Sequence, residues 1–289
     1  MKRTVEAEQY FTSKEVVEQS LSFLAKYFDL DNFDLVLEPS AGSGAFLLRL
    51  PETHRLGLDI FPMHDEVKQQ DFFSWLPSQG SKNILTIGNP PFGQRANLAI
   101  RFLEHASLFS SVIAFVLPRS FRKYTFINRV PPYFHLIDSF DCDAFESPSG
   151  EEIVVKSVFQ IWQKKPTVRK KLVPQATHAH FDMKHAHLSR TTPADFENLC
   201  SKYEFAVPQV GAAFKPRDPR GLTQGSYWFI SPKVPGVREA FEQLDFSFLD
   251  GMNTAHKSLS KTDIVAAYKS VIGEETHETS NNEVLVTLF

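Results

Sequence analysis

Four side chains in the first third of the chain have the types and the spacing of a ligand site. Glu38 precedes the glycine turn Gly42-Ser43-Gly44, Asp59 ends the next apolar run, and Asp71 is followed by Phe72. A carboxylate before such a turn can hold an ammonium group, and glycines let the backbone approach a ligand. An acid at a strand end can accept hydrogen bonds from two ribose hydroxyls. Asp71 can accept from an exocyclic amine whose purine lies on Phe72. Together these features indicate a site for a nucleoside that bears an amino acid.

The segment Asn89-Pro90-Pro91-Phe92 is the candidate catalytic motif. An exocyclic amine is a poor nucleophile because its lone pair is delocalised into the ring. The Asn89 side-chain oxygen and the Pro90 carbonyl can each accept one N–H, which localises that lone pair toward an electrophilic methyl group. Pro90 and Pro91 fix the turn, and Phe92 can stack on the presented base. The alternative for the motif is a rigid turn, and for each acid alone a helix cap or a solvated strand end.

Alternating strands and helices must position these residues. Apolar runs at 33–37 and 83–87 end just before Glu38 and Asn89, and the run at 55–60 has Asp59 next to its end. A weaker strand leads to Asp71. Ser13 is a predicted N-cap for a helix over 14–28, and 97–109 and 45–50 also have helical patterns. Further strands are predicted at 111–117, 134–140 and 153–162. This order predicts an α/β, Rossmann-like fold with a mostly parallel, seven-stranded sheet and a ligand site at the carboxyl ends of its strands.

Composition restricts the class of protein. The chain has 289 residues, 42% hydrophobic and 22% charged, which is typical of a globular protein. Its formal net charge of -3 means that any nucleic-acid site must be a local patch. Two distant cysteines, Cys142 and Cys200, exclude a disulfide framework and a cysteine-rich zinc module. We expect a cytoplasmic or otherwise intracellular protein, because no apolar stretch approaches the roughly 18 residues of a membrane helix or forms a secretion signal.

The pattern changes after Trp162, where a basic, proline-bearing stretch suits a linker or an exposed strand edge. We therefore predict a catalytic domain over 1–165 and a smaller mixed region over 166–289 that recognises the target or a partner. Strand-like runs follow at 172–183 and 226–230, and Ser260 is a predicted N-cap with Asp263 in the first turn of its helix.

Basic residues are candidates for nucleic-acid contact in both halves. The alternatives are a solvated helix start for the first group and an ordinary exposed loop for the second. The first group is Arg119, Arg122 and Lys123, and the second is Lys215, Arg217 and Arg220. No metal site is predicted, because the histidines at 178, 180, 185 and 187 have no accompanying carboxylate pattern.

The order Tyr10-Phe11-Thr12-Ser13, EPSAGSGAF, GLDI, DFF and GNPPFG resembles the S-adenosylmethionine-dependent N6-adenine methyltransferases. It is most similar to the DNA-modifying branch in phage-like or solitary form, with the cofactor motif before Asn-Pro-Pro-Phe. The resemblance covers about residues 8–165. It implies a methyltransferase fold, S-adenosylmethionine as cofactor, nucleic acid as partner and flipping of the target base.

The resemblance also implies roles for individual positions. Glu38, Ala41 and Gly42 match the positions that hold the methionine part of the cofactor, Asp59 the ribose, and Asp71 and Phe72 the adenine. Asn89, Pro90 and Phe92 match the positions that contact the target base. The full set implied to line the cofactor is Tyr10, Thr12, Glu38, Ser40, Ala41, Gly42, Asp59, Ile60, Asp71, Phe72 and Asn89.

Several alternatives remain open at the level of sequence. The same chemistry could act on structured RNA, because Asn-Pro-Pro-Phe occurs in families of both kinds. A third hypothesis is an enzyme that methylates a protein glutamine amide, although that branch typically has tyrosine where Phe92 stands. A fourth hypothesis is a non-catalytic nucleic-acid-binding subunit with the same fold. The presence of Asn89 and of the acids expected to bind the cofactor argues against this hypothesis.

Overall fold

The structure is a computed structural model that describes residues 11–78, 80, 82–146, 152–211, 213–250 and 258–274. Its described residues form two compact units that divide between Leu172 and Val173. The predicted boundary at 165/166 therefore falls seven residues before the observed one. Arg169 explains the difference, because its guanidinium donates to the carbonyl oxygens of Ile127 (2.8 Å) and Phe134 (3.1 Å) and ties this stretch to unit 1.

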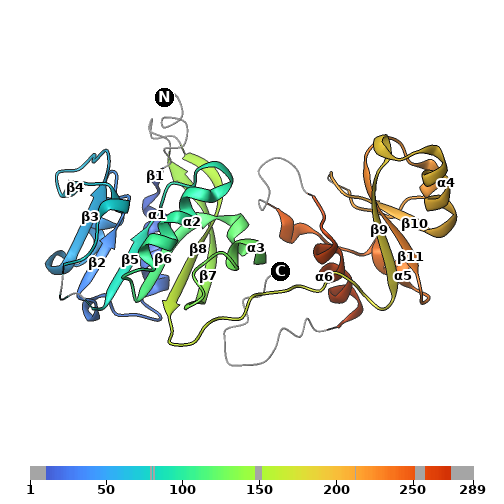
Figure 1. Cartoon of the computed structure of the whole chain (residues 1–289). Coiled ribbons are helices and arrows are strands. Elements are labelled where there is room, and N and C mark those ends of the chain that lie inside the picture. Colours follow the sequence, from blue (N-terminus) through green and yellow to red (C-terminus); the bar gives the residue numbers. More distant parts are fainter. Residues whose placement is uncertain are drawn as a thin grey trace. The chain divides into compact units, whose positions relative to one another are not determined.

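Unit 1 is built on one sheet (Figure 1). Its strands are β1 (Phe11–Thr12), β2 (Leu35–Glu38), β3 (Arg55–Asp59), β4 (Val67–Gln69), β5 (Ile84–Gly88), β6 (Val112–Pro118), β7 (Phe134–Glu146) and β8 (Glu152–Lys164). They lie in the order β1-β7-β8-β6-β5-β2-β3-β4, and β8 runs antiparallel to both of its neighbours. Without the two-residue β1, which was not predicted, the order is 3-2-1-4-5-7-6. That order is typical of the Rossmann-like methyltransferase fold, so the predicted fold class is confirmed.

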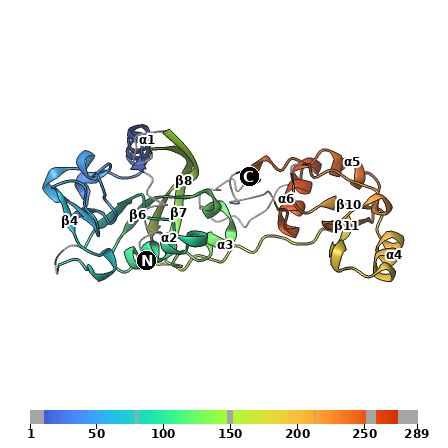
Figure 2. The same ribbon diagram turned by 90° about the horizontal axis from the view of Figure 1, so that it is seen from above.

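Helices cover both faces of this sheet, α1 (Lys14–Leu24) on one and α2 (Asn97–Ala106) on the other (Figure 2). Side chains of β6 alternate between two cores, as the pleat of a strand requires. Val112, Ala114 and Val116 pack in the core under α1, and Ile113, Phe115 and Leu117 pack in the core under α2. The predicted cap at Ser13 is confirmed, since its hydroxyl accepts the Val16 N–H. A sheet buried on both faces leaves its strand ends as the place for a ligand.

The remaining helices of unit 1 are short. They are α3 (Tyr124–Ile127), η2 (Leu30–Asn32), η3 (Leu47–Arg49), η4 (Glu52–His54), η5 (Phe72–Ser74), η6 (Gln94–Ala96) and η7 (Arg119–Arg122). The predicted helix over 45–50 is only the single 3₁₀ turn η3. Pro51 follows soon after this turn, and a proline cannot continue a helix. β3 then begins at Arg55, so the chain has no room for a longer helix.

Unit 2 has a three-stranded antiparallel sheet in the order β10-β11-β9. Its elements are β9 (Phe181–His187), η8 (Leu188–Arg190), α4 (Pro193–Lys202), β10 (Phe205–Pro208), η9 (Pro219–Gly221), β11 (Ser226–Pro232), α5 (Val237–Glu242), η10 (Ser247–Leu249) and α6 (Lys261–Ile272). The capping box of Ser260 with Asp263 is confirmed. The strand predicted over 172–183 is wrong, because it begins only at Phe181, where β11 provides a partner. Every helix among the described residues is too short or too polar to cross a membrane.

Candidate active site

Three of the predicted site residues meet at the carboxyl edge of the unit 1 sheet. Glu38 ends β2, Asp59 ends β3, and Asn89 directly follows β5. The three strands are adjacent and parallel in the order β5-β2-β3. Neighbouring strands lie about 4.8 Å apart, so one ligand can reach all three side chains.

Glu38 is almost completely buried, with 2% of its surface exposed. Its Oε2 atom accepts the Leu47 N–H at 2.7 Å. Gly88, at φ +146°, packs against the side chain so closely that an added Cβ would lie 3.1 Å from Glu38 Cγ. Burial raises the pKa of Glu38 to about 8, although the N–H groups of Leu47 and Phe46 oppose the shift. Glu38 is therefore a buried acid that carries its proton at neutral pH until a cation approaches.

Asp59 is tied to the glycine turn. Its Oδ2 atom accepts the Gly42 N–H and its Oδ1 atom accepts the Phe61 N–H, each at 2.8 Å. The turn is also tied to β3 by the Ala41 N–H, which donates to the Leu58 carbonyl at 2.9 Å. A carboxylate offers about four acceptor positions, so both oxygens of Asp59 can still accept hydrogen bonds from a ligand. The glycine turn and the acid thus form one rigid wall of the site.

Asn89 has a buried acceptor that nothing in the described chain satisfies. Its Oδ1 atom is inaccessible to solvent and has no hydrogen-bond partner among the described residues. The backbone carbonyl of Asn89 instead accepts the Ser40 hydroxyl at 3.1 Å, which fixes the residue against the glycine turn. An unpaired buried acceptor costs about 1–3 kcal/mol, so Asn89 Oδ1 is the candidate acceptor for a donor N–H at this edge.

The rest of the motif is anchored to α2. The Phe92 carbonyl accepts the N–H groups of Leu98 and Ala99 at 3.2 and 3.4 Å. Gly93 allows this close return, because it lies at φ +66° and a Cβ there would be 2.8 Å from Leu98 Cβ. Phe92 and Pro91 are half-buried and Pro90 is buried. The motif is therefore held on both sides, by Ser40 at Asn89 and by α2 at Phe92.

The aromatic side of the predicted cofactor site differs from expectation. Phe72 is 2% exposed and stacks on Phe102 with ring centroids 5.1 Å apart, so its ring belongs to the core and cannot lie on a purine in this structure. Asp71 stays exposed and caps η5 through the Phe73 N–H at 3.0 Å. The exposed apolar side chains beside Asp59 are those of Ile60 (53%) and Phe61 (61%). Sequence reasoning missed Phe61, although an apolar residue just after the strand-ending acid was the available signal.

The other predicted cofactor residues are distributed differently. Ala41 is buried beside Leu47, and Ser40 binds the Asn89 backbone as described. Thr12 pairs with Phe145 in β1, at the opposite edge of the sheet from β3, so the sheet does not bring it to Asp59. Tyr10 lies outside the described residues.

The two arginines of the first basic group are held in ion pairs, and their contact with nucleic acid stays a prediction. Arg119 and Arg122 have side chains that are only 13% and 17% exposed. Their guanidinium groups bind Asp143 and Asp141, 24 and 19 residues downstream. The alternative, a solvated helix start, fits only in part, because the segment forms η7 and leads into α3 but its two arginines are mostly buried. Lys123, which is half-buried, directly precedes α3.

The second basic group lies in unit 2. Lys215 donates to the Glu242 carbonyl, while Arg217 and Arg220 are exposed and Arg220 pairs with Glu197 at 3.4 Å. A shallow polar hollow of about 520 Å³ lies nearby. Its charged lining residues are Lys202, Arg220, Arg238, Glu204 and Asp218, so cations and acids are mixed there.

The histidines of unit 2 have structural partners. His178 contacts Glu274 at 3.2 Å, and His180 contacts the Tyr268 hydroxyl at 3.1 Å. Among the described residues, no group of three or more His, Cys, Asp or Glu side chains could hold a metal ion.

Comparison with known proteins gives structural matches alone. No protein-family model matches the sequence, and no curated protein matches it. A provisionally assigned RNA methyltransferase from Pyrococcus horikoshii is 17% identical, with a TM-score of 0.42 over 56% of this chain and 90% of its own. The 23S rRNA methyltransferase ErmE is 13% identical, with a TM-score of 0.39 over 91% and 100% of the two chains. The M protein of the type I restriction enzyme EcoKI is 13% identical, with a TM-score of 0.41 over 93% and 72%. These likenesses concern the fold, and the strand order of unit 1 itself defines it as the Rossmann-like methyltransferase fold.

Proposed function

We propose that this protein transfers a methyl group from S-adenosylmethionine to the N6 amine of adenine in DNA. The observation that carries the proposal is the Oδ1 atom of Asn89, which is buried and has no hydrogen-bond partner in the described part of the chain. It lies at the sheet edge that also holds Glu38 and Asp59. An acceptor in that position suits a substrate amine that arrives with its own N–H groups.

The residues present fit the cofactor. Glu38 would hold its ammonium group, because a buried acid gains most from a cation that replaces its proton. Asp59 would accept hydrogen bonds from the ribose hydroxyls, and the exposed Ile60 and Phe61 would cover the adenine ring. The chemistry that the cofactor supplies is an electrophilic methyl group on sulfur.

Asn89 and its neighbours act on the amine. The Asn89 Oδ1 atom and the Pro90 carbonyl each accept one amine N–H, which turns the nitrogen lone pair out of the ring plane toward the methyl group. The cofactor would supply the methyl group and leave as the neutral thioether, and the amine nitrogen would release one proton to solvent. Phe92, held by α2, supplies a stacking surface for the flipped base. Positioning and desolvation supply the acceleration, so no strong general base is required.

DNA is preferred to RNA because the resemblance over residues 8–165 is strongest to the DNA-modifying branch. The experiment that tests the function offers methyl-labelled S-adenosylmethionine with equal amounts of duplex DNA, single-stranded DNA, total RNA and protein extract. Digestion then identifies the labelled nucleoside or amino acid. We expect label in N6-methyladenine from DNA and none with Asn89→Ala. Label confined to RNA or to protein glutamine would overturn the proposal.

A further inference from the structure

A network of charged side chains lies beside the Asn-Pro-Pro-Phe motif at the carboxyl edge of the sheet. β6 is the neighbour of β5 on the side away from β2, and Gly88 pairs with Phe115 in their register. Arg119 begins the segment that follows β6, as Asn89 begins the segment that follows β5. The two segments therefore leave adjacent parallel strands at the same edge.

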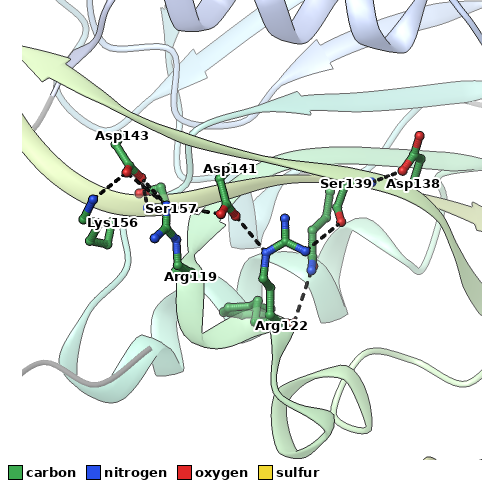
Figure 3. Close-up of polar contacts among 10 residues, drawn as sticks. Arg119, Arg122, Asp138, Ser139, Asp141, Asp143, Lys156 and Ser157 are labelled. Carbon is green, nitrogen blue, oxygen red and sulfur yellow. Dashed lines mark hydrogen bonds and ion pairs between the residues drawn. The ribbon is translucent and has the colours of Figure 1, made fainter. Parts of the chain in front are cut away.

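Asp143 of β7 is the centre of the network (Figure 3). Its two oxygens accept from Arg119 Nη2 at 2.9 and 3.0 Å, and Lys156 Nζ and the Ser157 N–H donate to it at 2.8 and 3.3 Å. Burial alone would raise the pKa of Asp143, but the Lys156 and Ser157 hydrogen bonds and the Arg119 charge outweigh it and hold that pKa below its usual value. Asp143 is therefore a carboxylate that holds two cations at once.

Asp141 continues the network along β7. Its carboxylate accepts from Arg122 Nε at 2.8 Å and lies 3.3 Å from Arg119 Nη2. Arg122 also donates to the Ser139 hydroxyl at 3.5 Å. Figure 3 shows Ser139, Asp141 and Asp143 along β7, facing the two arginines. The result is a fixed row of cations on the edge of the sheet.

The charges and their exposure indicate what this row can contact. Two arginines and Lys156 face two carboxylates, so the group keeps one positive charge in excess. Lys156 is 46% exposed, whereas Arg119 is 13% exposed. Partly buried ion pairs add little net stability, and their best-attested use is to fix one arrangement. Lys156, the most exposed of the three cations, and Arg122, which is 17% exposed, are thus held in position by Arg119 and two acids.

We propose that Asp141 and Asp143 are positioning residues for the nucleic-acid substrate. They hold Arg122 and Lys156, with Arg119 between them, so that these two cations contact the phosphate backbone beside the flipped adenine. The inference rests on the proposed function, because it takes nucleic acid as the substrate. It differs from a simple basic patch in giving two acidic residues a part in binding a polyanion.

That difference fixes the sign of the test. Removing a negative charge near a polyanion should tighten binding if the acids act only through their charge. Removing an acid that positions two cations should weaken binding instead. The full chain, with S-adenosylhomocysteine present, is therefore titrated against a labelled adenine-containing DNA duplex over a range of salt concentrations. The variants are Asp143→Asn, Asp141→Asn and Lys156→Ala. Asp31→Asn is the matched control, since Asp31 is an exposed acid before β2, at the amino edge of the sheet.

We expect Asp143→Asn and Asp141→Asn to weaken duplex binding about three- to tenfold, with cofactor affinity unchanged. Lys156→Ala should lower the slope of log K against log salt by about 0.9, the value for one phosphate contact on duplex DNA. Asp31→Asn should bind as the unchanged protein does or slightly more tightly. Circular dichroism and thermal melting verify that each variant is folded. Lys156→Ala removes an exposed side chain and should leave the ion pairs of Arg119 and Arg122 in place.

Equal or tighter binding by Asp143→Asn, together with an unchanged slope for Lys156→Ala, would overturn the inference and leave the proposed function standing. Failure of the unchanged protein to bind duplex DNA, single-stranded DNA or RNA would overturn the proposed function, and this inference with it.

Discussion

At the scale of single residues, Asn89 is where the ligand-free protein tolerates an unfavourable arrangement. Its side-chain oxygen is buried and has no hydrogen-bond partner among the residues that the structure describes, while its backbone carbonyl accepts the Ser40 hydroxyl. In the proposed reaction this acceptor gains its hydrogen bond when the substrate amine arrives, so we expect it to contribute to methyl transfer and not to cofactor affinity.

Asn89→Ala should therefore separate the two steps. We expect the single-turnover rate of methyl transfer to fall by about 10²–10³, the usual effect of removing one such group. The Kd for the cofactor should change by no more than about threefold, because Asn89 acts on the amine. Rapid quench and calorimetry measure the two quantities. A loss of cofactor affinity as large as the loss of rate would show that Asn89 belongs to the cofactor site.

Glu38 predicts a link between cofactor binding and protons. Its pKa of about 8 in the ligand-free protein lies above the ordinary 4.5, so between these values the folded protein binds more protons than the unfolded chain. Stability should therefore fall as pH rises from about 5 to 8. A bound ammonium favours the carboxylate form, so cofactor binding should release a proton and strengthen as pH rises from 6 to 8.

Calorimetry at pH 7 in two buffers with different ionisation enthalpies measures this proton release directly. We expect release of up to one proton for the unchanged protein and none for Glu38→Gln, which should also bind the cofactor more weakly. A binding enthalpy that does not depend on the buffer would mean that Glu38 is already ionised or does not meet the ammonium.

The polar site residues could be predicted from the sequence, but not whether each side chain is buried or ion-paired. Glu38, Asp59 and Asn89 could be predicted because each ends or follows an apolar run, and parallel strands bring such positions together. Phe72 could not be assigned, because an apolar ring suits a core as well as a ligand. Arg119 appeared to be a free cation because its partner, Asp143, comes 24 residues later on a different strand.

At the scale of elements, the end of β5 is held in place by a glycine. Gly88 lies at φ +146°, and an added Cβ would approach Glu38 Cγ to 3.1 Å. A shift of the Gly88 backbone would therefore move both the Glu38 side chain and Asn89, which directly follows it.

Gly88→Ala tests that coupling. We expect it to lower the free energy of unfolding by about 1–3 kcal/mol, since alanine is strained at this φ. It should also weaken cofactor binding, because the methyl group displaces the Glu38 side chain. Gly221→Ala is the control, since an added Cβ there meets nothing within 4 Å. Urea unfolding of both variants measures the difference, and equal stabilities would remove Gly88 from this role.

The element pattern could be predicted where strands are buried on both faces. The segment 111–117 became β6 with a shift of one residue, because its uninterrupted apolar run suits a central strand. Two short elements were not predicted correctly. η3 replaced a helix because Pro51 ends it, and β1 is a strand only because β7 provides a partner.

At the scale of the whole molecule, the chain divides into two compact units between Leu172 and Val173, seven residues after the boundary expected from the sequence. The composition of the basic stretch after Trp162 indicates a linker or an exposed strand edge. Sequence could not show that Arg169 binds carbonyl groups of unit 1, or that Asn128 and Leu172 exchange two hydrogen bonds of 2.8 Å.

These contacts predict how the chain can be shortened. A chain ending at Leu172 should fold and bind the cofactor, because every candidate cofactor residue lies upstream. A chain ending at Lys165 loses the Arg169 and Leu172 contacts, and we expect its melting temperature to be lower by about 5 °C or more. Differential scanning calorimetry compares the two. Equal melting temperatures would show that residues 166–172 do not stabilise unit 1.

The central claim is that this molecule methylates the N6 amine of adenine in DNA. The most direct measurement is nucleoside mass spectrometry of genomic DNA from a bacterial host without adenine methylation that expresses either the full chain or its Asn89→Ala variant. We expect N6-methyldeoxyadenosine with the unchanged chain and background levels with the variant. Unmethylated DNA in both cells, with the modified nucleoside found in the RNA of the first, would contradict it.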